Sequence, residues 1–421
     1  MPTALLPRLF PVRQTFNPAP SPDIAATLRV ELPRLKVAPG QRIGIAVGSR
    51  GIAGLRDMVF EVVRFVREAG AEPFIIPAMG SHGGATPEGQ TALLAEYGVS
   101  PETLQVPVRA SMEVRLAGKT TQGAEVFLSA EALDADGLII LNRVKPHTDF
   151  TGEIGSGILK MLSIGLGKRV GAASLHASAS RYGHESVLLE AGRLACRTLP
   201  VIGAVAIVEN QRHTPAILEV VLAPDIERRE RELMAEARRL MPSIPFDDID
   251  LLIVDWLGKN ISGAGMDPNV IFRGVQGYSS DLSGMTAKPV IRRIFVRDLT
   301  PESRGNAIGV GLADFTSGRL ARAMNREVTF VNSLTSLTHQ CAKLPVHFEH
   351  DAETIACALS TLALPPGVTP RVVQIQDTLN LGNLRVSENL LPEVESRGNL
   401  TILGPAEEMS FDSEGRLAPA G

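Results

Sequence analysis

The segment NRVKPHTDFTGEIGSGILKMLSIGLGKRVGAASLHA, residues 142–177, carries an unusual set of reactive side chains. His147 and His176 stand near its two ends, and Lys160 lies between them among glycines and apolar residues. An apolar setting lowers the pKa of a lysine and makes its amine a nucleophile, and imidazole is the usual general acid or base near neutral pH. The segment therefore indicates covalent or proton-transfer chemistry. The alternative is a lysine whose amine reaches out to water along the surface.

Apolar runs end next to further reactive residues. Three such runs, residues 42–48, 71–81 and 135–144, predict strands. The residues at their ends are Gly48, Ser49, Arg50, His82, Lys145 and His147. Helical patterns follow the first two runs, and this alternation predicts a parallel sheet with crossover helices. Ligands of such sheets bind beyond the carboxyl ends of the strands, so we expect these side chains to converge.

Two glycine-rich stretches resemble phosphate loops to different degrees. GSRGIAG places Gly48, Gly51 and Gly54 at a strand-to-helix turn, where backbone N–H groups can bind an anion. Its spacing is not that of the dinucleotide fingerprint. IGLGKR lacks the first glycine of the nucleotide-triphosphate motif, and Arg169 follows Lys168 where Ser or Thr is required. We therefore predict a generic anion site at the first stretch and none at the second.

The domain organisation is predicted from the length of the chain and from a proline-containing linker. The length of 421 residues predicts more than one domain. A proline-containing linker, PSIPFDDI, precedes a new strand. The sequence therefore predicts an α/β protein with two parallel-rich domains and an active-site cleft between them. The predicted parts are a domain over 1–245, a domain over 246–390, and a tail over 391–421 that returns to the first domain.

Composition excludes several classes of protein. A net charge of −4 offers no electrostatic footprint for nucleic acid. Cys196, Cys341 and Cys357 are too few and too far apart for a disulfide framework, a zinc site or an iron–sulfur site. No apolar run approaches the roughly 18 residues of a membrane span, and the first residues lack the features of a secretory signal. We expect a soluble cytoplasmic protein that does not bind membranes.

In its order of Arg50, His82, His147, Lys160 and His176, the chain resembles the nickel-pincer-dependent lactate racemases. The resemblance covers about residues 40–210 and extends more loosely into the second domain. It implies two α/β domains and a cofactor between them. That cofactor is a pyridinium mononucleotide carrying a nickel pincer, made by separate biosynthetic enzymes.

The resemblance assigns cofactor-binding roles to four residues. Lys160 matches the lysine that attaches the cofactor covalently. His176 matches the histidine that completes nickel coordination. Gly48 and Ser49 would hold the cofactor phosphate, in agreement with the anion site predicted there.

The resemblance also implies how the substrate is held. His82 and His147 match paired acid/base histidines on opposite faces of a 2-hydroxy acid. Arg50 matches the arginine that holds the substrate carboxylate in a bidentate pair. From the second domain, Lys259 and Asn260 are the residues expected to contact the substrate. The implied activity is racemisation or epimerisation by hydride abstraction from Cα and return to the other face.

Other readings of the same residues stay open. The substrate could be lactate-like, or malate-like because Lys145 and Lys259 add positive charge. The protein could instead be a cofactor-free lyase or isomerase, with Lys160 as a Schiff-base amine and His147 as base. It could also be a non-catalytic protein that binds a small anion at GSRG.

Overall fold

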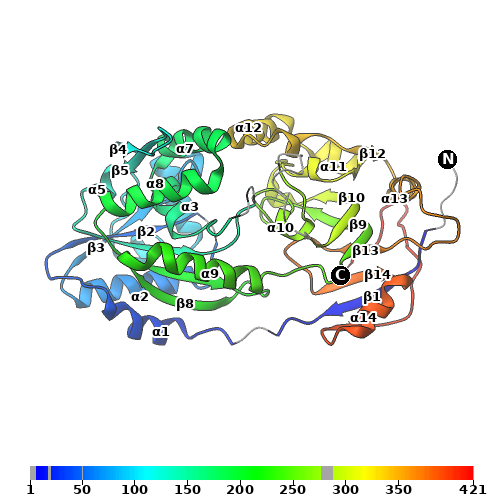
Figure 1. Ribbon diagram of the computed structural model, residues 1–421, viewed down its shortest axis with the longest axis horizontal. Helices are drawn as coiled ribbons and strands as arrows, with labels where there is room; N and C mark the ends of the chain where they lie inside the picture. The colour runs from blue at the N-terminus through cyan, green and yellow to red at the C-terminus, as the bar shows by residue number, and fades with distance from the viewer. Residues whose placement is uncertain are drawn as a thin grey trace. The chain divides into compact units, whose positions relative to one another are not determined.

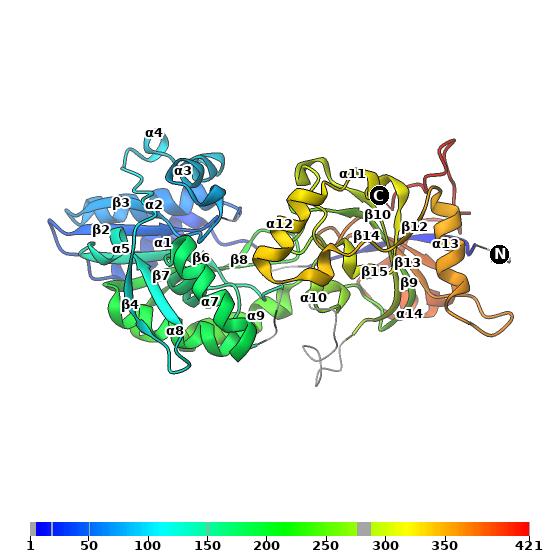
Figure 2. The same cartoon turned by 90° about the horizontal axis from the view of Figure 1, so that it is seen from above.

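The computed structural model describes residues 6–17, 20–49, 51–148, 150, 152–275 and 288–420. The chain forms two compact units, shown in Figure 1 and, turned by 90°, in Figure 2. One unit comprises Pro18–Met241, and the other comprises Met1–Asn17 with Pro242–Gly421. We call them the middle unit and the terminal unit. Within the described ranges, no helix is both long and apolar enough to cross a bilayer.

The described part of the middle unit contains a five-stranded sheet in the order β3-β2-β6-β7-β8. Its strands are β2 (Arg42–Val47), β3 (Glu72–Pro77), β6 (Gly137–Arg143), β7 (Val201–Glu209) and β8 (Pro215–Leu222). All neighbouring pairs are parallel except β7 and β8. The strands are nearly continuous apolar runs because helices cover both faces of the sheet.

Helices on the two faces of this sheet form two separate cores. One core contains residues of α1 (Ile24–Glu31) and α2 (Leu55–Glu68). The opposite core contains residues of α7 (Lys168–Tyr182), α8 (His184–Thr198) and α9 (Ile226–Leu240). Shorter elements are α3 (Pro87–Glu96), α4 (Pro101–Leu104), β4 (Val114–Lys119), β5 (Glu125–Ser129), α5 (Ala130–Leu133) and α6 (Ile158–Lys160). The three predicted strands are thus present, and their carboxyl ends share one edge because they run parallel.

The described part of the terminal unit contains an eight-stranded sheet in the order β12-β11-β10-β9-β13-β14-β1-β15. The strands are β1 (Leu9–Gln14), β9 (Asp248–Leu257), β10 (Val290–Leu299), β11 (Phe315–Ser317), β12 (Val346–Phe348), β13 (Val372–Ile375), β14 (Asn383–Ser387) and β15 (Leu400–Ile402). The helices are α10 (Pro268–Ile271), α11 (Gly318–Ala323), α12 (Arg326–Ser336), α13 (Asp351–Ser360) and α14 (Leu391–Ser396). The stretch from β12 to β13 is parallel, and the rest is antiparallel. The predicted α/β class with parallel-rich sheets is confirmed.

Both ends of the chain differ from the predicted division. β1 pairs with β14 and β15, so residues 9–14 lie in the sheet of the terminal unit (Figure 1). The tail, predicted over 391–421, is assigned to that same unit. The reason is that β1 pairs with strands more than 350 residues away, and such long-range pairing leaves no local signal in the sequence.

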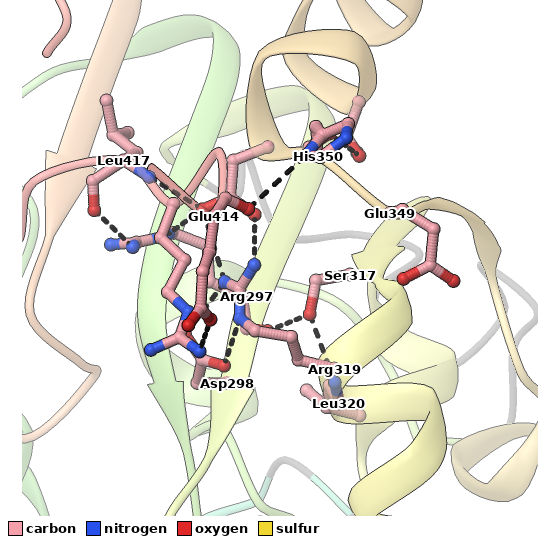
Figure 3. Close-up of polar contacts among 12 residues, drawn as sticks. Arg297, Asp298, Ser317, Arg319, Leu320, Glu349, His350, Glu414 and Leu417 are labelled. Carbon is pink, nitrogen blue, oxygen red and sulfur yellow. Dashed lines mark hydrogen bonds and ion pairs between the residues drawn. The ribbon is translucent and has the colours of Figure 1, made fainter. Parts of the chain in front are cut away.

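The tail is held by buried charges in the terminal unit (Figure 3). Arg297 donates hydrogen bonds to Asp255 at 2.6 Å and Asp351 at 3.0 Å, and also to the carbonyl of Leu417. The Leu417 N–H donates to Asp351 at 2.9 Å. Arg319 donates hydrogen bonds to both Asp351 and Asp298. Buried charges are tolerated only when they are paired and hydrogen-bonded, and the tail provides part of that pairing.

Candidate active site

The helical segment that carries Lys160 begins at a close contact with α9. Glu230 of α9 is fully buried, and its Oε2 accepts a hydrogen bond from the Leu159 N–H at 2.8 Å. A Cβ on Gly157 would lie 2.2 Å from Glu230 Oε1, so only glycine allows this approach. Burial raises the pKa of the Glu230 carboxyl to about 7. Glu230 therefore fixes the start of the helix two residues before Lys160.

An unusual helix follows Lys160. Met161–Gly165 form a π-helix, which has a wider turn than an α-helix. Such turns are rare in proteins, but those that occur are often at functional sites. Gly165 is packed so closely that a Cβ would lie 2.6 Å from the Ala78 carbonyl oxygen. The Gly165 carbonyl accepts a hydrogen bond from the Gly80 N–H at 3.0 Å. The helical segment that carries Lys160 is thus packed against, and hydrogen-bonded to, the segment that follows β3.

His147, Lys160 and His176 line one small pocket. Its other lining residues are Phe150, Ile164, Leu175, Ala179, His184, Val187 and Leu188. The Lys160 Nζ lies 2.6 Å from His147 Nε2 and 3.4 Å from Ser156 Oγ. The cavity volume is about 20 Å³, which is enough for about one water molecule. The structure therefore brings together three of the residues predicted from the sequence, in a pocket with an apolar floor.

Phe150 and His184 also shape this pocket, although the sequence analysis did not select them. Phe150 stacks on His147 with ring centroids 4.5 Å apart, and on His184 at 5.3 Å. His184 is the first residue of α8, directly after the helix that carries His176. The signal that could have found it is its place in the sequence, because only Gly183 separates His184 from the end of the helix that carries His176.

His147 is held in its neutral form. Its pKa is lowered well below the usual value, first by burial and then by the charge of Lys160 and by His184 and His176. The residue as a whole is half-buried, and the packed atoms around its ring disfavour imidazolium. When the Lys160 amine is protonated it can only donate, and the contact then requires Nε2 of His147 to accept and the ring proton to be on Nδ1. The neutral imidazole is the form of histidine that can act as a general base.

His82 lies outside the residues that line this pocket, in the loop after β3. Its Nδ1 is 2.5 Å from the hydroxyl of Ser49, which follows β2. The carbonyl of Ser49 accepts a hydrogen bond from the Tyr97 hydroxyl at 2.9 Å. A Cβ on Gly48 would lie 3.0 Å from Met161. Two predicted site residues thus meet at adjoining strand ends, beside the helix that carries Lys160.

Of the three predicted substrate-binding residues, Lys259 and Asn260 are not among those that line the described pocket. Arg50 lies outside the described residues. Lys259 and Asn260 follow β9 in the terminal unit, where Lys259 Nζ donates to the Gly263 carbonyl at 2.7 Å. Asn260 Oδ1 accepts from the Thr300 hydroxyl at 2.7 Å. Their roles as substrate contacts stay predictions.

The described residues contain no group of three or more His, Cys, Asp or Glu side chains arranged to hold a metal ion.

Comparisons with known proteins agree with this fold. A family profile described as "Domain of unknown function (DUF362)" matches residues 54–262. No curated protein matches the sequence. The lactate racemase apoprotein from Thermoanaerobacterium thermosaccharolyticum is similar in structure, with a TM-score of 0.50 and 13% sequence identity over 88% of this chain and 89% of that chain. A Thermotoga maritima protein is similar with a TM-score of 0.49 and 12% identity, over 66% of this chain and 72% of that one. The racemase similarity shows a shared fold.

Proposed function

We propose that the protein is a racemase or epimerase of a small 2-hydroxy acid that works with a lysine-tethered nickel-pincer nucleotide. The observation that carries this proposal is the meeting of His147, Lys160 and His176 in one pocket. The similarity in fold to a lactate racemase apoprotein supports it.

The chain offers residues that fit the cofactor. Lys160 would carry the covalent linkage, and His176 would supply one imidazole to the metal. Gly48 and Ser49 would face the phosphate, because backbone N–H groups at a strand-to-helix turn bind anions. The pocket is too small to enclose a nucleotide, so its lining residues Lys160 and His176 would contact only the linkage and metal end of the group, and the rest would lie outside the pocket. When bound, the group supplies a reversible acceptor for the hydrogen of the substrate Cα.

The protein residues have the properties that the rest of the reaction requires. His147 is neutral and presents Nε2 as an acceptor, so it takes the hydroxyl proton of the substrate. His82, hydrogen-bonded to Ser49, serves the opposite face of the substrate. Arg50 holds the substrate carboxylate while the planar keto acid reorients. The proton then returns from the histidine on the other face.

A chiral assay tests this function. The chain is produced together with the pincer-biosynthetic enzymes and given single enantiomers from a panel of lactate-like and malate-like 2-hydroxy acids. We expect inversion of at least one acid, and a loss of at least 100-fold in His147→Gln. Equal turnover in His147→Gln would contradict the role of His147, and no inversion of any acid by cofactor-loaded protein would contradict the function.

A second function is favoured by one specific contact. The 2.6 Å between Lys160 Nζ and His147 Nε2 also suits a Schiff-base lysine with an adjacent base, as in a cofactor-free lyase or isomerase. Borohydride reduction of protein made without the biosynthetic enzymes, in the presence of carbonyl substrates, would trap such an adduct on Lys160. A trapped adduct favours this second function, and its absence favours the first.

A further inference from the structure

A fully buried lysine lies just beyond the π-helix. Lys168 is the first residue of α7, has no exposed surface, and adopts a left-handed backbone with φ of 53°. Its Nζ donates to the Pro77 carbonyl at 2.7 Å and to Gln90 Oε1 at 3.1 Å. Neither acceptor carries a charge, and burial lowers the pKa of Lys168 to about 8. A strained backbone and a desolvated amine are retained here only because the surrounding contacts determine both.

Gln90 connects Lys168 to the loop that holds His82. We call the hydrogen bonds of Lys168 and Gln90 the network. Gln90 lies on α3 and is also fully buried. Its Nε2 donates to the carbonyls of Gly80 at 3.0 Å and His82 at 3.3 Å. A lysine ammonium can only donate, so it requires the Gln90 oxygen on its own side. The amide NH₂ must then face the two loop carbonyls, and Lys168 thereby sets the direction of the whole amide.

We propose that Lys168 and Gln90 are positioning residues that fix the His82 loop relative to the helix carrying Lys160. Pro77 ends β3, and the carbonyls of Gly80 and His82 are in the loop that follows. Lys168 follows the π-helix on the other side, where the Gly80 N–H also bonds to Gly165. The network thus joins two segments that are far apart in sequence. The effect of the network on catalysis rests on the proposed function, whereas the hydrogen bonds that join the two segments do not depend on it.

Two substitutions separate the halves of the network. Lys168→Met removes the amine and keeps an unbranched chain. Gln90→Glu keeps an acceptor for Lys168 and adds its counter-ion, but it has no N–H for the carbonyls of Gly80 and His82. Should the first variant not fold, the second still tests the link. Arg169→Met is the matched control because it removes the charge of the next residue, which is exposed.

The experiment records imidazole signals of protein labelled with ¹³C-histidine and made without any cofactor, with the His82 signal assigned by its loss in His82→Gln. We expect the His82 signal to shift and broaden in Lys168→Met and Gln90→Glu, and to stay in place in Arg169→Met. An unmoved His82 signal in a folded variant of either network residue overturns the proposal. In cofactor-loaded protein with measurable turnover, the same variants should lower kcat at least tenfold with little change in KM. A protein with no turnover at all would contradict the proposed function and leave the imidazole result standing.

Discussion

The amine of Lys160 lies 2.6 Å from Nε2 of His147, thirteen residues earlier in the chain. The contact exists because β6 ends just before His147, while Glu230 and the π-helix fix the helix that carries Lys160. The Lys160 amine and an imidazole of lowered pKa are thus held against each other in a pocket lined mostly by apolar side chains. Each of the following predictions tests one part of this arrangement.

The charge of Lys160 should be measurable at His147. The lysine is the second cause, after burial, of the lowered pKa of His147. Lys160→Met should therefore raise the pKa of His147, which should still stay below its ordinary value because burial persists. Titration of the ¹³C-histidine signals measures this change. Lys119→Met, at an exposed ion pair with Glu125, is the control and should leave the pKa unchanged. A fall in the pKa of His147 in Lys160→Met would contradict the arrangement.

Glu230 should make stability depend on pH. Its folded-state pKa of about 7 lies above the ordinary value of 4.5, so the folded chain binds its proton more tightly than the unfolded chain. Stability is fully present below the ordinary value and is lost as pH rises from there to about 7, by on the order of 3 kcal/mol. Glu230→Gln should lack this loss. Denaturation at pH 5 and pH 8 measures it, with Glu236→Gln, on the more exposed side of α9, as control. Parallel pH profiles for the wild type and Glu230→Gln would be inconsistent with a proton bound at Glu230.

Gly157 should tolerate no side chain. An added Cβ would lie 2.2 Å from Glu230 Oε1, and overpacking of a buried contact costs about 1–3 kcal/mol. Gly157→Ala should lower the free energy of unfolding by that amount and displace the helix that begins at Ile158. Gly398→Ala is the control, because an added Cβ there meets no atom within 4 Å. Equal stability of the two variants would show that Glu230 does not occupy this position.

Arg297 should be essential to the terminal unit. It is buried between Asp255 and Asp351, so Arg297→Leu leaves Asp255 without its ion-pair partner and Asp351 with Arg319 alone. Such a loss costs about 3–5 kcal/mol. Arg322→Leu removes an exposed pair with Glu349 and should cost less than about 1 kcal/mol. Chemical denaturation compares the two, and a similar small loss in both would mean that the Arg297 network is not formed.

The sequence predicted those features that depend on local pattern. Apolar runs located β2, β3 and β6, and the glycine-rich setting singled out Lys160 and His176. The parallel topology then explains why polar residues after β2 and β3, namely Ser49 and His82, come into contact.

Features that depend on contacts between distant segments were missed. Glu230 lies 71 residues from its partner Leu159, and Lys168 lies 78 residues from Gln90. Neither residue differs locally from an ordinary surface-helix glutamate or a loop lysine, and only the packing of α9 and α3 reveals their burial. Lys168 lies in IGLGKR, which does not match the nucleotide-triphosphate motif, and nothing else in the sequence indicated its buried position.

The most direct test of the central claim is the intact mass and nickel content of the protein produced with the pincer-biosynthetic enzymes. The account predicts an added mass and bound nickel in the wild type, no added mass in Lys160→Ala, and an added mass with reduced nickel in His176→Ala. An added mass that persists in Lys160→Ala, or a wild-type chain with neither added mass nor nickel, would contradict it.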